Sequence, residues 1–193
     1  MNTALPRLRR AYFECRHGQL HVHNAIPVGG GFDELTTLLC LHGSAGSGGV
    51  FLELSRRLGI SRSVYSPDLP GCGESDASPT SLAITGYADA IGDFLDSMRF
   101  RQIDLLGIGA GSAVAVELAI VRPKVVRKLC LLGSPALDAE GPTAGARALR
   151  TAASRWQDDR RQLIKQPLLP LPLEANAQPD ADSLAQQLSA FLA

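Results

Sequence analysis

The residues best placed to do chemistry surround a glycine-rich turn at residues 107–111, Gly-Ile-Gly-Ala-Gly. An apolar run at residues 103–106 precedes the turn, and a stretch of helical character follows at residues 112–121. A tight turn between a strand and a helix can present a nucleophilic serine, cysteine or aspartate above the end of a sheet. The central position here is Gly109, which has no side chain to attack a substrate.

Two other loops follow apolar runs and carry polar groups. His42, Gly43 and Ser44 come after residues 36–41, and Asp68 opens the segment Asp-Leu-Pro-Gly-Cys-Gly-Glu-Ser. Backbone amides in such loops can stabilise negative charge that develops on a carbonyl oxygen. A serine nucleophile would also need an imidazole to accept its proton. The sequence holds four histidines, all before the glycine turn: His17, His21, His23 and His42.

The elements that must position these loops alternate between strands and helices. Residues 12–15 and 19–26 predict a β-hairpin with glycine at its turn. Residues 36–41, 103–106 and 126–132 are apolar runs typical of strands covered on both faces, with a short strand near Val64. Between them lie segments with apolar residues at helical spacing, most clearly residues 84–98. We predict an α/β protein, a three-layer α/β/α sandwich with a mostly parallel sheet.

The three loops, in this order, resemble the α/β-hydrolase superfamily over residues 12–136. The resemblance implies that the amides of the residues after His42-Gly43 and after the nucleophile form an oxyanion site. It therefore predicts a substrate-binding site at Gly43, Ser44, Gly109 and Ala110 for a small carbonyl or acyl ligand. The alternative is that these glycines serve only the close approach of the loop to the elbow. Family members place the triad acid and histidine after the nucleophile. Glycine at position 109 and the absence of a later histidine both argue against a working Ser-His-Asp triad.

The C-terminal part is shorter than the resemblance implies. We expect one domain over residues 1–193, with a recognisable core at 12–136 and a shortened segment at 137–193. The final helix, starting at residues 179–182, carries an apolar stripe. A shortened sheet would leave its sixth strand as an exposed edge, and such edges tend to pair. We therefore expect either that two copies of the chain form a homodimer through this edge, or that the proline-rich residues 166–173 cover it.

Other residues offer weaker alternatives. Ser112 would serve as a displaced nucleophile only from inside the helix, where a capping or packing role is favoured. Cys72 is expected to be an inert loop thiol, and Asp138 a turn residue rather than a triad acid. His21 and His23 project from one face of a strand, and we interpret them as a solvated hairpin face because no third metal ligand is indicated. Asp68 is expected to bond the backbone of its own loop.

Amino-acid composition limits the classes of partner to be expected. The chain has 193 residues, 45% hydrophobic and 20% charged, with 19 basic and 19 acidic side chains. A net charge near zero gives no electrostatic reason to expect nucleic acid or an anionic membrane as partner. Four dispersed cysteines without a CxxC pair favour a reducing compartment, and no apolar run is long enough for a membrane span. We expect a cytoplasmic protein without metal or cofactor.

Two classes of function follow. The first is a catalytically impaired or non-enzymatic protein that binds a small ligand or a partner near the glycine turn. The alternative is an active hydrolase of small esters, thioesters or lactones with an unconventional site. A third reading is a structural scaffold that oligomerises through the sheet edge.

Overall fold

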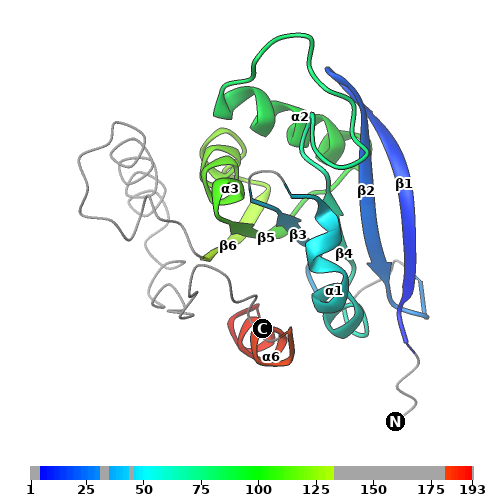
Figure 1. The fold of residues 1–193 in the computed structure, drawn as a ribbon. Helices are drawn as coiled ribbons and strands as arrows, with labels where there is room; N and C mark the ends of the chain where they lie inside the picture. The colour runs from blue at the N-terminus through cyan, green and yellow to red at the C-terminus, as the bar shows by residue number, and fades with distance from the viewer. Residues whose placement is uncertain (1–4, 31–34, 44–45, 133–180, 193) are drawn as a thin grey trace.

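The computed structural model describes residues 5–30, 35–43, 46–132 and 181–192, which form a twisted six-stranded sheet between two layers of helices (Figure 1). The strand order is β1-β2-β4-β3-β5-β6. β1 (Arg7–Cys15) and β2 (Gly18–Ile26) form an antiparallel hairpin, and β2 also runs antiparallel to β4 (Val64–Pro67). β3 (Leu38–Leu41), β5 (Ile103–Ile108) and β6 (Val126–Leu132) continue the sheet in parallel with β4. The predicted three-layer α/β fold is confirmed.

Each face of the sheet has its own hydrophobic core. One cluster joins the sheet to α2 (Ile84–Ser97) and α3 (Ala110–Val121). The other joins it to a 3-10 turn, η1 (Gly48–Phe51), to α1 (Leu52–Leu58) and to α6 (Ala181–Leu192). The parallel strands are mainly apolar because both of their faces are covered, with Asp104 of β5 and Arg127 and Lys128 of β6 as the charged exceptions.

The final helix packs as its apolar stripe predicts. Leu184, Leu188 and Leu192 are buried, and α6 lies against α1. Two basic side chains of β6 hold its C-terminal end. Arg127 donates to the carbonyl of Leu192 and Lys128 to that of Phe191, each at 2.8 Å. Cations at the C-terminal end of a helix also complement its dipole.

Several element boundaries differ from those expected from the sequence, most clearly at the starts of β1, β3 and α3. β1 begins at Arg7 rather than Tyr12, because pairing with β2 extends over arginines that carry no apolar alternation. β3 begins at Leu38 rather than residue 36. α3 begins at Ala110 rather than Ser112, so the glycine turn runs directly into the helix. The expectations for residues 137–180 and for Asp138 lie outside the described residues.

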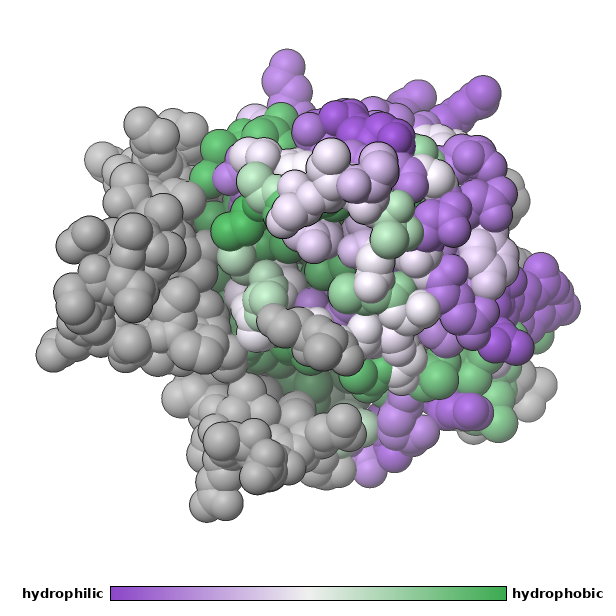
Figure 2. All heavy atoms as spheres, turned by 45° about the horizontal axis from the view of Figure 1, so that its top comes forward, coloured by the Kyte–Doolittle hydropathy of each residue, from purple (hydrophilic) through white to green (hydrophobic). Residues whose placement is uncertain are grey.

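The polarity of the surface and the nature of the two sheet edges indicate where another chain could pair with this one. Hydrophilic residues gather on the side of the β1–β2 hairpin, and hydrophobic ones appear toward the centre of the view (Figure 2). The edge strand β1 exposes Arg7 and Glu14, and charged side chains discourage pairing along an edge. β6 ends the sheet among the described residues, so dimerisation through that edge stays a prediction. Within the same residues, no helix has the length and apolarity to cross a membrane.

Candidate active site at the β5–α3 elbow

The glycine turn is an elbow between the end of β5 and the start of α3. Gly109 stands at its apex with φ 54° and ψ −121°, a conformation that favours glycine. Its amide donates to the carbonyl of Leu132 on β6 at 3.1 Å, and its carbonyl accepts from the Ser112 amide at 3.1 Å. The backbone thus makes the sharp turn that presents a nucleophile in this type of fold.

The three glycines of the elbow are required for different reasons. A Cβ on Gly107 would lie 2.7 Å from the Gly111 carbonyl oxygen, and one on Gly111 would overlap the carbonyl oxygens of Leu41 and His42. These two glycines let the helix approach β5 and β3. Among the described residues, a Cβ on Gly109 would meet only the Cα of Gly43, at 3.6 Å. These residues leave room for a side chain at Gly109, and the feature of theirs that disfavours one is the backbone conformation.

Three of the four predicted binding residues come together around this apex. Gly43 faces Gly109 from the end of β3, and Ala110 is the exposed first residue of α3. The first amides of a helix have no intrahelical acceptor, and no backbone hydrogen bond between described residues uses the Ala110 amide. This amide can therefore donate to a ligand oxygen. Ser44, the fourth predicted residue, lies outside the described residues.

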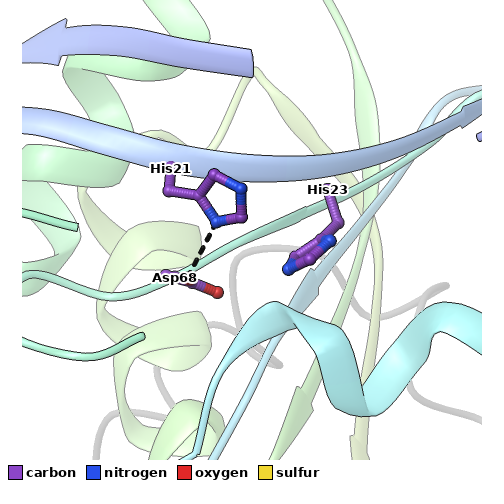
Figure 3. Close-up of side chains that lie close together, drawn as sticks. All are labelled: His21, His23 and Asp68. Carbon is purple, nitrogen blue, oxygen red and sulfur yellow. Dashed lines mark hydrogen bonds and ion pairs between the residues drawn. The ribbon is translucent and has the colours of Figure 1, made fainter. Parts of the chain in front are cut away.

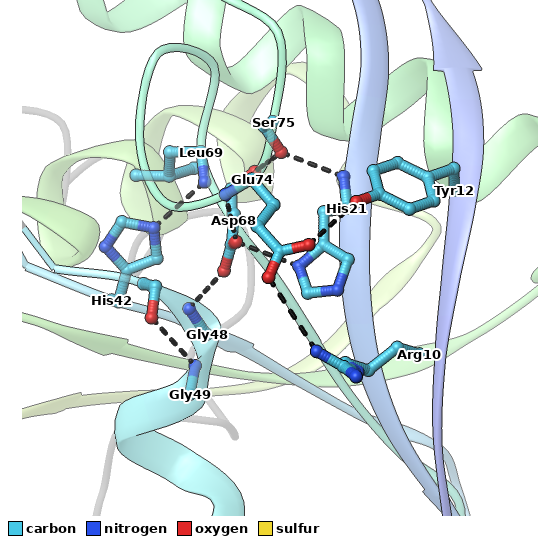
Figure 4. A network of polar contacts seen from close by, with 11 residues as sticks. Arg10, Tyr12, His21, His42, Gly48, Gly49, Asp68, Leu69, Glu74 and Ser75 are labelled. Carbon is cyan, nitrogen blue, oxygen red and sulfur yellow. Dashed lines mark hydrogen bonds and ion pairs between the residues drawn. The ribbon is translucent and has the colours of Figure 1, made fainter.

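His42 ties the loop after β3 to the loop after β4 (Figure 4). Its Nε2 accepts from the Leu69 amide at 2.9 Å, so Nδ1 carries the proton and donates to the Gly43 carbonyl at 2.7 Å. Burial lowers the pKa of His42, although the Gly43 carbonyl and Asp68 act in the opposite direction. A neutral imidazole with both nitrogens engaged holds the loop in place and is not available as a general base.

Asp68 organises the loop that follows β4, as the sequence predicts, and it also reaches β2 (Figure 4). Its carboxylate accepts from the Gly48 amide at 2.6 Å, the Glu74 amide at 2.9 Å and His21 Nδ1 at 2.9 Å. Burial acts to raise the pKa of Asp68, but these hydrogen bonds outweigh it and lower the pKa below its ordinary value. Asp68 is therefore an ionised carboxylate inside the protein.

Cys72 has the properties of an unactivated thiol. It is half-buried in the loop after Asp68. Burial raises its pKa, and the negative charge of Asp68 raises it further. Because the thiolate is the reactive form, these shifts favour the inert role expected from the sequence.

Ser112 packs inside α3, and its hydroxyl is already engaged. The side chain is fully buried and donates to the Gly107 carbonyl at 3.0 Å. We expect Ser112→Ala to lower the free energy of unfolding by about 1 kcal/mol through loss of this bond, as measured by urea denaturation. The hydrolysis of p-nitrophenyl acetate should not change. Turnover in the wild type that vanishes in the variant would identify Ser112 as a nucleophile.

The expectation of a solvated face at His21 and His23 is wrong. His21 is 1% exposed and hydrogen-bonded to Asp68, and His23 is half-buried. The sequence placed both histidines on one face of β2, but it could not show that β4 ends beside them. The order of strands in the sheet brings Asp68 to this face.

Comparisons with known proteins agree with the fold. A sequence profile of the alpha/beta hydrolase family matches residues 38–193. The pimeloyl-[acyl-carrier protein] methyl ester esterase of Neisseria meningitidis serogroup A is 32% identical over 166 residues, which are 83% of this chain and 50% of that protein. The chain thus spans about half the length of this curated relative.

Solved structures give the same result. The N-acyl homoserine lactonase AidH, as a serine-to-glycine variant complexed with N-hexanoyl homoserine lactone, is 26% identical with a TM-score of 0.59. The match covers 69% of this chain and 51% of that chain. The epoxide hydrolase CorEH shares the fold at 20% identity, with a TM-score of 0.62 over 71% of this chain and 46% of that chain. With the profile matching most of its length, this chain belongs to the alpha/beta hydrolase family.

Proposed function

We propose that this chain binds a small ester, lactone or related acyl compound at the β5–α3 elbow without attacking it through a side chain there. The observation that carries the proposal is Gly109, which keeps the backbone angles of a nucleophile elbow but has no nucleophile. The protein would then be a catalytically impaired member of its family that retains ligand binding.

The geometry around Gly109 supports binding of a carbonyl group. Ala110, an exposed residue, begins α3, and the positive end of the helix dipole at its amide favours an oxygen acceptor. The position a side chain would occupy at Gly109 has only the Gly43 Cα close by among the described residues. A ligand carbonyl can therefore approach the Ala110 amide more closely than it could above a serine.

The named relatives support the ligand class. The neisserial relative is named as an esterase of an acyl-carrier-protein methyl ester, and AidH as an N-acyl homoserine lactonase. The AidH variant with glycine in place of a serine is complexed with N-hexanoyl homoserine lactone. A glycine substitution in this fold is thus compatible with a bound lactone, and this chain has glycine at the apex of its elbow.

The test measures binding and turnover on the same sample. We expect N-hexanoyl homoserine lactone, or a member of a p-nitrophenyl ester series, to bind in isothermal titration calorimetry. Mass spectrometry should then recover the ligand without hydrolysis beyond the buffer rate. Ala110→Pro removes the amide donor at the first position of α3, where proline is tolerated, and should weaken binding about tenfold.

Ala110→Gly is the matched control, because it changes the same residue and keeps the amide. It should bind like the wild type. Rapid hydrolysis by the wild type would contradict the proposal and favour an active hydrolase with an unconventional site. Equal binding by Ala110→Pro and the wild type would show that the elbow amide is not the contact.

A further inference from the structure

Away from the elbow, two histidines and an aspartate meet where β2 lies beside β4. His21 and His23 are two residues apart on β2 and so share a face of the strand. The antiparallel register pairs Val22 with Pro67, and the Asp68 amide donates to the His21 carbonyl at 2.8 Å. The backbone therefore places Asp68 directly opposite His21.

The three side chains converge (Figure 3). His21 Nδ1 lies 2.9 Å from Asp68 Oδ2, and the rings of His21 and His23 are 4.6 Å apart between centroids at 81°. One ligand atom from each of the three residues lies within 4.8 Å of the other two. Ligands at about 2.0–2.1 Å from a tetrahedral ion are roughly 3.3 Å apart, so movements of about 1.5 Å or less would close the cluster. The side chain of His23 is half-buried and that of His21 fully buried, so His23 is the ligand less confined by packing.

His21 carries a polar atom whose partner is missing among the described residues. The residue is 1% exposed, yet its Nε2 has no hydrogen-bond partner there. Buried polar side-chain atoms are mostly hydrogen-bonded, so this nitrogen needs an explanation. In this structure Nδ1 of His21 faces the Asp68 carboxylate, which only accepts. An ion bound by both residues would take the place of the proton between them, and the ring proton would then lie on Nε2, the position from which metal-bound histidines donate to a carboxylate, a carbonyl or a water.

We propose that His21, His23 and Asp68 form a binding site for a divalent transition-metal ion such as Zn²⁺. Two imidazoles and a carboxylate suit Zn²⁺ and its neighbours Co²⁺ and Ni²⁺, whereas Mg²⁺ and Ca²⁺ prefer sites made of oxygen ligands. With three protein ligands, a tetrahedral ion keeps one position for water.

Metal binding would join the N-terminal hairpin to the loop after β4. Asp68 already holds the Gly48 and Glu74 amides, so an ion at its carboxylate would connect β2, η1 and this loop. An ion that binds only the folded chain stabilises it in proportion to the logarithm of its concentration. The site is independent of the elbow, and its test does not require an enzymatic activity.

The experiment titrates ZnCl₂ into the chelator-treated full chain by isothermal titration calorimetry. We expect one equivalent to bind, with a concentration-dependent rise in Tm, and MgCl₂ to have neither effect. His23→Ala removes a half-buried ligand and should lower the Zn²⁺ affinity at least tenfold. His17→Ala is the matched control, since it removes a histidine of the same hairpin that lies outside the cluster, and it should bind like the wild type.

Co²⁺ provides a second readout that needs no variant. The Co²⁺-loaded wild type should show the visible absorption of a four- or five-coordinate nitrogen and oxygen site. A sulfur charge-transfer band would assign the ion to cysteines and overturn the proposal. The absence of Zn²⁺ binding, or equal affinity in His23→Ala and the wild type, would overturn it as well.

Discussion

Gly111→Ala is expected to destabilise the protein by about 3 kcal/mol, the upper range for overpacking of a rigid site. The new Cβ would overlap the carbonyl oxygens of Leu41, the last residue of β3, and of His42, which follows it. Backbone atoms cannot rotate away as a flexible side chain can, so α3 would have to move off the sheet. Urea denaturation followed by circular dichroism measures the loss.

Gly109→Ala is the matched control for this prediction. Among the described residues its Cβ would make only an ordinary contact, at 3.6 Å with Gly43, so the expected cost is that of placing a side chain at φ 54° and ψ −121°, about 2 kcal/mol. Equal destabilisation by the two variants would show that close approach does not distinguish these glycines. The larger loss of stability expected for Gly111→Ala reflects a glycine required by packing, whereas the smaller loss for Gly109→Ala reflects a glycine required by backbone conformation.

Asp104→Asn is expected to lower the free energy of unfolding by about 3–5 kcal/mol, the usual cost of breaking a buried ion pair by removing one partner. Asp104 is fully buried in β5. Its carboxylate accepts from Arg127 Nε at 2.8 Å and Nη2 at 2.6 Å, and from Arg62 Nη1 at 3.1 Å. Arg62 is only 2% exposed, so the variant would leave a buried guanidinium without this carboxylate.

An exposed pair provides the comparison. Asp96 accepts two hydrogen bonds from Arg122, at 2.9 and 2.8 Å, but its side chain is 61% exposed. Asp96→Asn should cost less than about 1 kcal/mol, because solvent screens the pair and hydrates each charge after its loss. Guanidinium denaturation would mask such charge effects, so urea is the denaturant of choice. Similar losses of unfolding free energy in both variants would contradict the conclusion that burial makes the ion pairs of Asp104 important for stability.

Arg127 links this ion cluster to the end of the chain. Its Nε and Nη2 donate to the Asp104 carboxylate, and Nη2 also donates to the Leu192 carbonyl of α6. Arg127 thus couples Asp104 of β5 to the docking of α6, whose Leu192 lies 65 residues after Arg127. Loss of Asp104 should therefore also loosen α6.

The candidate site was partly predictable because its features are local. The glycine turn, the strand before it and the helix after it are contiguous, so their pattern predicted an elbow with Gly109 at the apex. The pairing of Gly43 with this apex came from the family resemblance, and the described structure agrees. What the sequence could not distinguish was the reason for each glycine, since overlap with β3 depends on atoms about 70 residues away.

The sequence by itself determined the alternation of strands and helices, the apolar stripe of α6 and the absence of a side chain at the elbow. These follow from periodicity and residue type, which are properties of short segments. Only the tertiary structure decided that His21 is buried against Asp68 and that Asp104 meets Arg62 and Arg127. The first pair is separated by 47 residues and depends on β2 lying beside β4. Strand order sets such contacts, and no local pattern encodes it.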